Sequence, residues 1–234
     1  MSVVLWPSGL PHDPFSIVRS IFFAATLPGI PEYLNRERAP RDATRGIDSP
    51  LLVETRSDAD LIAQVLAGHS DAYAILVDRH RDRCYRFAVR LLGDRDDADE
   101  ALQSAFVRAF RGLAGCRNRD HLSGWLLQIV RNECRTIAGR RAKRAQRFVR
   151  DDDELNKAPI EQPAETTAML EEIQFALDKI ELDQREAFLL KYVEELSYDE
   201  MSSLTGASVP ALKMRVSRAC AQLRKLLKRE GIHS

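Results

Sequence analysis

The sequence predicts an all-α fold, with two small helical domains joined by a flexible linker and a helix-turn-helix in the C-terminal domain. Three observations favour this fold class. Apolar residues recur at three- and four-residue spacing from about residue 58 onward, which is typical of amphipathic helices. No convincing run alternates apolar and polar residues as a half-buried strand would. An acidic segment with two prolines, at 149–165, lacks the helical spacing and therefore indicates a linker.

The first 57 residues are expected to be a mostly disordered N-terminal extension. Seven of the ten prolines precede residue 51, and neither helical nor strand spacing persists there. The strongly apolar run at 15–27 is interrupted by Arg19 and is too short to span a membrane. It also lacks the preceding basic segment of a signal peptide, so neither membrane insertion nor secretion is predicted.

The segment 58–148 is predicted to form the first helical domain. Helical spacing starts with this segment and is broken at Gly93. A new helix follows that glycine and runs to about Leu113. A loop at 112–124 then precedes the last helix of the domain, which begins near Trp125.

The helix that ends near Leu113 has one strongly acidic face. Asp94 or Asp96 can cap it, and further carboxylates favour the positive end of the helix dipole. Positions i, i+3, i+4 and i+7 of one face are Asp96, Asp99, Glu100 and Gln103, while the opposite face is apolar and includes Phe106. By spacing alone, a solvated acidic surface is favoured over a binding site. Acid–base catalysis is not favoured, because neither a nucleophile nor a metal ligand accompanies the carboxylates.

The last helix of the first domain combines an apolar face with a basic one. The apolar face carries Leu126, Ile129, Val130, Cys134 and Ile137. The other face is expected to turn outward Gln128, Arg131, Asn132, Arg135, Arg140 and Arg141. Amide and guanidinium groups donate to base edges and phosphates, so this face is a candidate for nucleic-acid binding. Trp125 could stack on a base, although a core anchor is the preferred interpretation.

A second helical domain is predicted at 166–230, and its C-terminal part has the pattern of two helices joined by a tight turn. Ser197 and Glu200 make a capping box for the first of these helices. Gly206 ends that helix, because a turn with positive φ is easiest for glycine. A cap residue and a proline in the first turn then start the second helix. This pattern is a helix-turn-helix.

The second helix of the motif has a buried apolar stripe and a basic outer side, which suits a phosphate backbone. The N-terminal part of a recognition helix reaches base edges, so the residues expected near a DNA groove are Ser208, Pro210, Ala211, Lys213, Met214, Arg215 and Arg218. A helical bundle whose basic surface never contacts nucleic acid is the alternative.

The composition argues against several function classes. The formal net charge is zero, with 35 basic and 35 acidic residues, which is unusual for a protein that must attract DNA by itself. The charges are segregated along the chain, so one surface could meet DNA and another a protein. Four cysteines without a CxxC pair and five histidines without ligand spacing predict no metal site and favour reduced thiols in the cytoplasm. No phosphate loop or nucleophile–base pair indicates catalytic residues or a cofactor.

The order of these parts resembles that of bacterial RNA polymerase sigma factors of the extracytoplasmic-function (ECF) subfamily. The acidic helix contains DADEALQSAF, which is similar to the family's Asp-Ala-Glu-Asp-x-x-Gln-Glu-x-Phe. The basic helix begins with WLLQIVRN, which is similar to Trp-Leu-x-x-Ile-Ala-Arg-Asn, and the family's C-terminal motif is matched by LSYDEMSSLTGASVPALKMRVSRA. The resemblance covers about residues 58–229.

This resemblance implies a cytoplasmic transcription initiation factor that binds core RNA polymerase and directs it to promoters. The acidic helix, including Phe106, would hold the clamp of the polymerase β′ subunit, and the β subunit would be a further contact. The basic helix would bind the opened minus-ten element, and the helix-turn-helix would bind the duplex minus-thirty-five element. The family also implies an anti-sigma factor as a partner, and a monomer is expected before holoenzyme assembly.

Three residues depart from the family pattern. Ser104 replaces a usual glutamate, Thr136 a common aspartate and Ala211 a common threonine. The first departure slightly weakens the polymerase assignment, and the other two suggest an altered promoter preference. The alternatives are a dimeric helix-turn-helix repressor or activator, a helical adaptor for acidic proteins, and, least favoured, an enzyme.

Overall fold

The computed structural model describes residues 56–116, 121–147 and 172–229. Every regular element in these ranges is helical, which confirms the all-α prediction. The extension before residue 56 and the predicted linker at 149–165 lie outside the described residues. No helix in the described ranges is long and apolar enough to cross a membrane.

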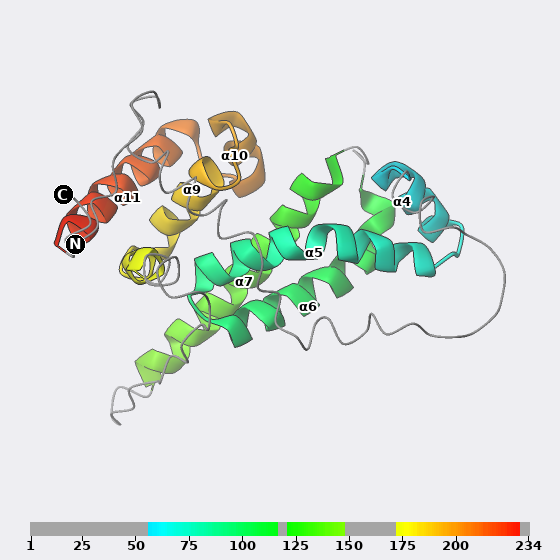
Figure 1. The fold of residues 1–234 in the computed structure, drawn as a ribbon, viewed down its shortest axis with the longest axis horizontal. Helices are drawn as coiled ribbons and strands as arrows, with labels where there is room; N and C mark the ends of the chain where they lie inside the picture. Colours follow the sequence, from blue (N-terminus) through cyan, green and yellow to red (C-terminus); the bar gives the residue numbers. More distant parts are fainter. Residues whose placement is uncertain (1–55, 117–120, 148–171, 230–234) are drawn as a thin grey trace, which may run out of the picture.

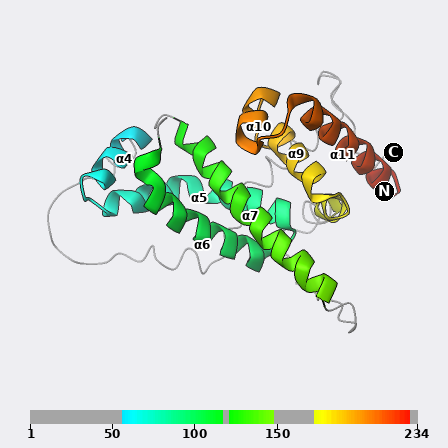
Figure 2. The same ribbon diagram turned by 180° about the vertical axis from the view of Figure 1, so that it is seen from behind.

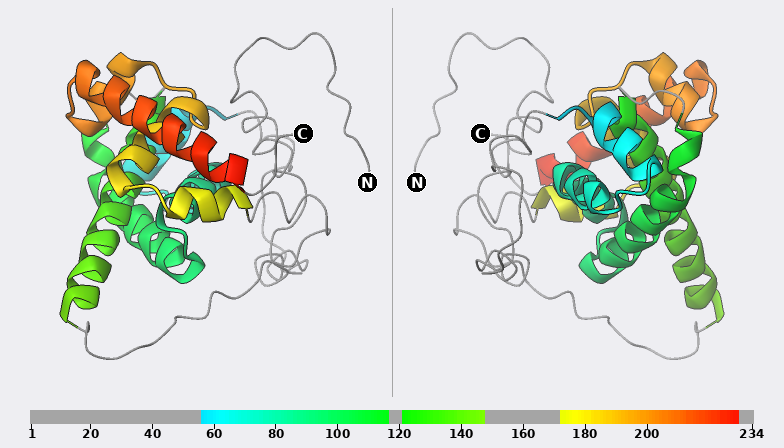
Figure 3. Two further views of the ribbon diagram at one scale, coloured as in Figure 1. Left: turned by 90° about the vertical axis from the view of Figure 1, so that its left-hand side faces the viewer. Right: turned by 90° about the vertical axis from the view of Figure 1, so that its right-hand side faces the viewer.

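The first domain consists of helices α4 (Asp58–Leu66), α5 (Asp71–Leu92), α6 (Arg95–Gly112) and α7 (Leu122–Arg147), with the short 3-10 helix η1 (Leu113–Gly115). Helices α5, α6 and α7 pack against one another, and α4 packs on α5 and η1 (Figure 1). The C-terminal end of α7 projects beyond this bundle (Figure 3).

Side-chain caps fix the start of two of these helices. Ser57 and Asp60 form a capping box at the N-terminus of α4. Asp94 caps α6 by accepting a hydrogen bond of 2.9 Å from the backbone N–H of Asp97, which decides between the two candidates that the sequence offered. The glycine just before this cap, Gly93, adopts φ +71°, so the chain can leave α5 in the left-handed region and enter α6 directly.

The core of the first domain is built from the apolar faces that the helical spacing predicts. Phe87, Leu91 and Leu127 are almost completely buried there, and Trp125 packs against this core as an anchor. The thiols of Cys84 and Cys134 are buried in the same region. Burial raises the pKa of both thiols to about 12, so they remain protonated and act as small apolar side chains.

The second domain contains a helix at 172–178, followed by α9 (Leu182–Tyr192), α10 (Tyr198–Thr205) and α11 (Val209–Arg229). Helices α10 and α11 form the predicted helix-turn-helix, and both pack on α9. The capping box of Ser197 with Glu200 is present at the start of α10, as the sequence predicts. Gly206 ends α10 with φ +74°, again as predicted.

The two domains pack against each other, with α9 lying against α5 and forming ion pairs with α7 (Figure 2). One continuous cluster of buried side chains extends through both domains. Near the C-terminus of α5, Arg185 donates a 2.8 Å hydrogen bond to the carbonyl of Leu91. A cation at this position is favourable, because the last carbonyls of a helix carry partial negative charge.

Candidate polymerase and nucleic-acid interfaces

The acidic face of α6 is exposed, as the sequence predicts. Asp96, Asp99, Glu100 and Gln103 all lie on the solvent side of this helix. Glu100 forms an ion pair of 2.6 Å with Arg140 of α7, but about half of each side chain stays accessible. Solvent screening leaves such a pair little net energy, so it can be exchanged for a partner on another protein.

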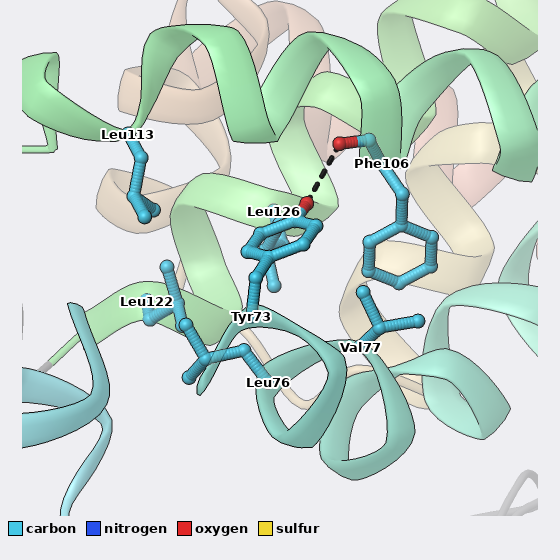
Figure 4. A pocket seen from close by; sticks show the side chains of 7 residues that line it. All are labelled: Tyr73, Leu76, Val77, Phe106, Leu113, Leu122 and Leu126. Atoms are coloured by element: carbon cyan, nitrogen blue, oxygen red, sulfur yellow. Dashed lines mark hydrogen bonds between the residues drawn. The ribbon is translucent and has the colours of Figure 1, made fainter. Parts of the chain in front are cut away.

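Phe106, which the sequence places on the apolar face of α6 and the resemblance assigns to polymerase binding, is half-buried. It lines a small apolar recess with Tyr73 and Val77 of α5, and the Tyr73 hydroxyl donates a 2.6 Å hydrogen bond to the Phe106 carbonyl (Figure 4). Burial raises the pKa of Tyr73 to about 12. Phe106 therefore helps to fix α6 on α5 beneath the exposed face.

The exposed face of α6 continues into two apolar residues that the sequence analysis missed. Val107 and Phe110 are 47% and 45% exposed, which is unusual for side chains of this size. They stand four and seven positions after Gln103, so they extend the helical spacing of the acidic residues. That continued spacing was the available signal, although large apolar side chains in a helix are more often expected in the core.

The second domain buries one part of the predicted basic face of α7 and leaves the rest exposed. Asn132, Arg140 and Arg141 are exposed, whereas Gln128 and Arg135 are half-buried. Arg131 is only 8% exposed, so the expectation that it faces outward is wrong. The reason is tertiary, because Glu186 of α9 lies against Arg131 and supplies it with a carboxylate partner.

Two carboxylates of α9 form ion pairs with the arginines of α7. Arg131 makes a two-pronged ion pair with Glu186, with distances of 2.6 Å and 3.2 Å. Arg135 donates through Nη1 to both Glu186, at 3.0 Å, and Asp183, at 2.7 Å. The side chain of Glu186 is only 2% exposed, so its charge depends on these guanidinium partners.

The pKa of Asp183 is lowered by this arrangement. Burial alone would raise it, but the hydrogen bond and charge of Arg135, together with Arg215 and Arg131, outweigh that effect. The pKa of Arg135 is correspondingly raised by the two carboxylates, against the opposing effect of burial. Asp183 and Arg135 are therefore both ionised at neutral pH.

The start of α11 presents most of the predicted groove residues to solvent. Ser208, Pro210, Lys213, Met214 and Arg218 are exposed, and Ala211 is half-buried. Met214 is 55% exposed. Lys213 lies 5.6 Å from the centre of the Tyr198 ring, which places α10 directly behind this surface. Arg215 differs, because its guanidinium is 2.9 Å from the carboxylate of Asp183 on α9.

Two family models and several relatives match this chain. A model described as Sigma-70 region 2 matches residues 76–147, and one described as Sigma-70, region 4 matches residues 170–223. The ECF RNA polymerase sigma factor EcfG of Rhodopseudomonas palustris (strain TIE-1) is 35% identical over 147 residues, which are 62% of this chain and 79% of that protein. The chain belongs to the ECF sigma factors. It is thus a protein that directs RNA polymerase to promoter-specific transcription initiation, as the resemblance implied.

Other relatives agree with this assignment. The sigma factor is 33% identical over 178 residues to SigM of Mycobacterium tuberculosis (strain H37Rv), covering 74% of this chain and 85% of that one. Its fold is similar to that of the sigma factor RpoE of Bartonella quintana, solved with the anti-sigma factor NepR, with TM-score 0.57, 26% identity and coverage of 65% and 94%. A structure of CnrH with the cytosolic domain of CnrY gives TM-score 0.55, 26% identity and coverage of 75% and 100%.

The two matched regions contain the three sets of candidate residues in the sigma factor. The region 2 match contains the acidic face of α6 and the basic face of α7, and the region 4 match contains α10 and the start of α11. Sigma factors are non-catalytic initiation factors, so these surfaces are expected to bind rather than to react.

Proposed function

We propose that this sigma factor binds core polymerase through α6, contacts the opened minus-ten element through α7, and contacts the duplex minus-thirty-five element through the start of α11. The first domain then comprises residues 58–148 and the second 166–230, with 149–165 as the linker. The observation that carries the proposal is the presence, in one chain, of an exposed acidic face, a basic helix and a helix-turn-helix in the order of the family.

The proposed polymerase surface combines charge with apolar area. Asp96, Asp99, Glu100 and Gln103 supply carboxylates and an amide, and Val107 and Phe110 extend the same face. Exposed aromatic and aliphatic side chains at the edge of a polar patch are typical of protein-binding sites. A cationic partner surface, such as a helical part of the β′ clamp, would match this chemistry.

The proposed minus-ten surface uses the donors of α7. Gln128, Asn132 and the arginines at positions 131, 135, 140 and 141 offer amide groups for base edges and guanidinium groups for phosphates. Unstacking a base costs a few kcal/mol per step, and contacts with the polymerase are expected to offset this cost. A net charge of zero fits such dependence on polymerase, because the sigma factor alone attracts DNA weakly.

We also propose an anti-sigma factor as a partner and the cytoplasm as the location. Two similar solved structures are complexes, one of the sigma factor RpoE with the anti-sigma factor NepR and one of CnrH with the cytosolic domain of CnrY. The buried free thiols of the sigma factor agree with a reducing compartment.

Transcription with core RNA polymerase tests the proposed polymerase surface. The wild-type chain should bind core polymerase in a pull-down and start transcription at specific sites. Glu100→Lys should weaken core binding at least about tenfold, because it opposes a cationic partner with a like charge. Asp82→Lys, an equal charge change at an exposed position of α5, is the control and should bind as wild type.

Two outcomes would contradict the proposal. If the wild-type chain neither bound core polymerase nor started transcription, the assignment of all three surfaces would fail. If Glu100→Lys bound core polymerase as tightly as Asp82→Lys, the assignment of the α6 face alone would fail, and the other two surfaces would stand.

A further inference from the structure

Arginines from both proposed DNA-binding surfaces meet at one carboxylate of the second domain. Asp183 accepts from Arg135 of α7 at 2.7 Å through Oδ1, and its Oδ2 lies 2.9 Å from Arg215 of α11. Glu186, one helical turn later, holds Arg131 and shares Arg135. Three arginines assigned to DNA are therefore occupied by two acidic residues of α9.

This arrangement is incompatible with simultaneous binding of both promoter elements. Elements centred near minus ten and minus thirty-five are about 25 base pairs apart, which at 3.4 Å per base pair is about 85 Å. In the structure, the guanidinium groups of Arg135 and Arg215 lie on opposite oxygens of a single carboxylate. The two domains must separate before both elements can be bound.

We propose that Asp183 and Glu186 form a carboxylate latch, which holds the free sigma factor closed and self-inhibited by occupying arginines of both DNA-binding surfaces. This inference rests on the proposed function, because it takes Arg131, Arg135 and Arg215 as DNA-binding residues. A carboxylate is a suitable internal substitute for DNA, since guanidinium groups bind carboxylates and phosphates with the same paired geometry.

The chemistry of the latch makes it reversible. Arg131 and Glu186 give up hydration in the closed state, with side-chain exposures of 10% and 2%, and their attraction must offset that cost. When the domains separate, water and then phosphates can replace each lost partner. A purely apolar interface would lack such a replacement and would resist opening more strongly.

Contacts outside the latch support the same closed state. Arg83 of α5 pairs with Glu194 at 2.7 Å, and Arg185 donates to the carbonyl of Leu91. The 24 residues from 148 to 171 connect the domains, and a fully extended chain of that length spans at most about 86 Å, so separation does not require either domain to unfold. Removing the latch should therefore shift the equilibrium toward the open state without disrupting the helices.

Fluorescence energy transfer in the free, full-length protein tests the latch. Dyes are placed through Ser70→Cys at the start of α5 and Ser217→Cys on α11, both at exposed positions, while the four native cysteines are buried. The latch variant is Asp183→Asn with Glu186→Gln. The control, Glu172→Gln with Glu181→Gln, removes the same charge from exposed positions of the same domain.

The latch variant should show lower transfer efficiency than wild type, and the control should not. Without dyes, the latch variant should bind a 30-base-pair mixed-sequence duplex at least about tenfold more tightly than the control. The slope of the logarithm of its binding constant against the logarithm of the salt concentration should become steeper by up to about 2.7, because three arginines are released. Equal helical circular dichroism in both variants verifies that they are folded.

The inference is overturned if wild type already shows the low transfer efficiency of an open protein. It is also overturned if a folded latch variant matches the control in transfer efficiency and DNA binding. These measurements contain no polymerase, so they are distinct from the transcription test. Loss of transcription with an intact latch response would reject the proposed function and leave the closed contact established.

Discussion

At the scale of single residues, Arg215 is expected to have different partners in the free sigma factor and on promoter DNA. In the free sigma factor it pairs with Asp183, and its side chain is 31% exposed. On promoter DNA it is proposed to bind a base edge or phosphate. Its removal is therefore expected to weaken both the closed state, which would favour DNA binding, and the promoter complex, which would disfavour it.

We expect Arg215→Ala to weaken promoter-specific binding by the holoenzyme by about 1–3 kcal/mol at a matched minus-thirty-five element. Competition between promoter variants during transcription measures this loss and shows whether preference relaxes at one base pair. Lys225→Ala, two to three turns further along α11 at an exposed position, is the comparison. If Lys225 contacts a phosphate, its replacement by alanine would weaken binding to all promoter sequences equally. Unchanged promoter preference in Arg215→Ala would remove this arginine from the set that recognises sequence.

Arg131 shows the limit of prediction at the residue scale. Helical spacing correctly separates the apolar face of α7 from its polar face, and an arginine on the polar face is normally solvated. The residue is buried because Glu186, 55 positions later in the chain, docks on it. No local pattern around Arg131 contains that information.

At the scale of elements, the helix-turn-helix depends on the backbone of its turn. Gly206 has φ +74°, and a Cβ at this position would have no atom within 4 Å. Any cost of a side chain there is therefore conformational rather than steric. The turn sets the direction in which α11 leaves α10, and hence the orientation of the proposed recognition surface.

Gly206→Ala should lower the free energy of unfolding by about 1–2 kcal/mol, because an L-residue is strained in the left-handed region. Gly139→Ala is the matched comparison, since this exposed glycine lies inside α7 and its Cβ would also meet no atom within 4 Å. There the expected change is a gain of about 0.5–1 kcal/mol. Urea unfolding of both variants measures the difference. Equal changes in the free energy of unfolding for the two variants would show that stability does not depend on the left-handed conformation at Gly206.

For helix α6, the sequence predicted the position of the helix well but only part of its exposed surface. Its boundaries, its aspartate cap and its exposed acidic face agree with the structure. The exposed apolar residues Val107 and Phe110 were missed, because periodicity alone does not say how wide the buried stripe of a helix is. That width is set by the neighbouring helices.

At the scale of the whole molecule, charges between the domains determine how the closed state responds to pH. The charged groups that face Asp183 are Arg131, Arg135 and Arg215, with Glu186 beside them. The pKa of Asp183 is lowered in the closed state, so protonation favours the open state. The stabilisation by Asp183 is therefore fully present above its ordinary pKa of about 3.9 and is lost as the pH falls through the lower, closed-state value.

We accordingly expect energy transfer between the dyes at positions 70 and 217 to stay constant from about pH 8 to pH 5. Opening that depends on Asp183 should begin only below about pH 4, and Asp183→Asn should lack this step. Circular dichroism at each pH separates opening from unfolding. A step near pH 6 to 7 would show that a group other than the latch controls the closed state.

The sequence by itself determined the all-helical class, the helix-turn-helix with its capping box, and the family. These features depend on contacts within a few residues: apolar spacing, the capping box at Ser197, the aspartate cap before α6 and the glycine at 206. Only the tertiary structure decided that α9 docks on α5 and α7, that Arg131 is buried, and that Arg135 and Arg215 share Asp183. The physical reason is that docking depends on the fit and charge of surfaces far apart in the chain, which local spacing does not encode.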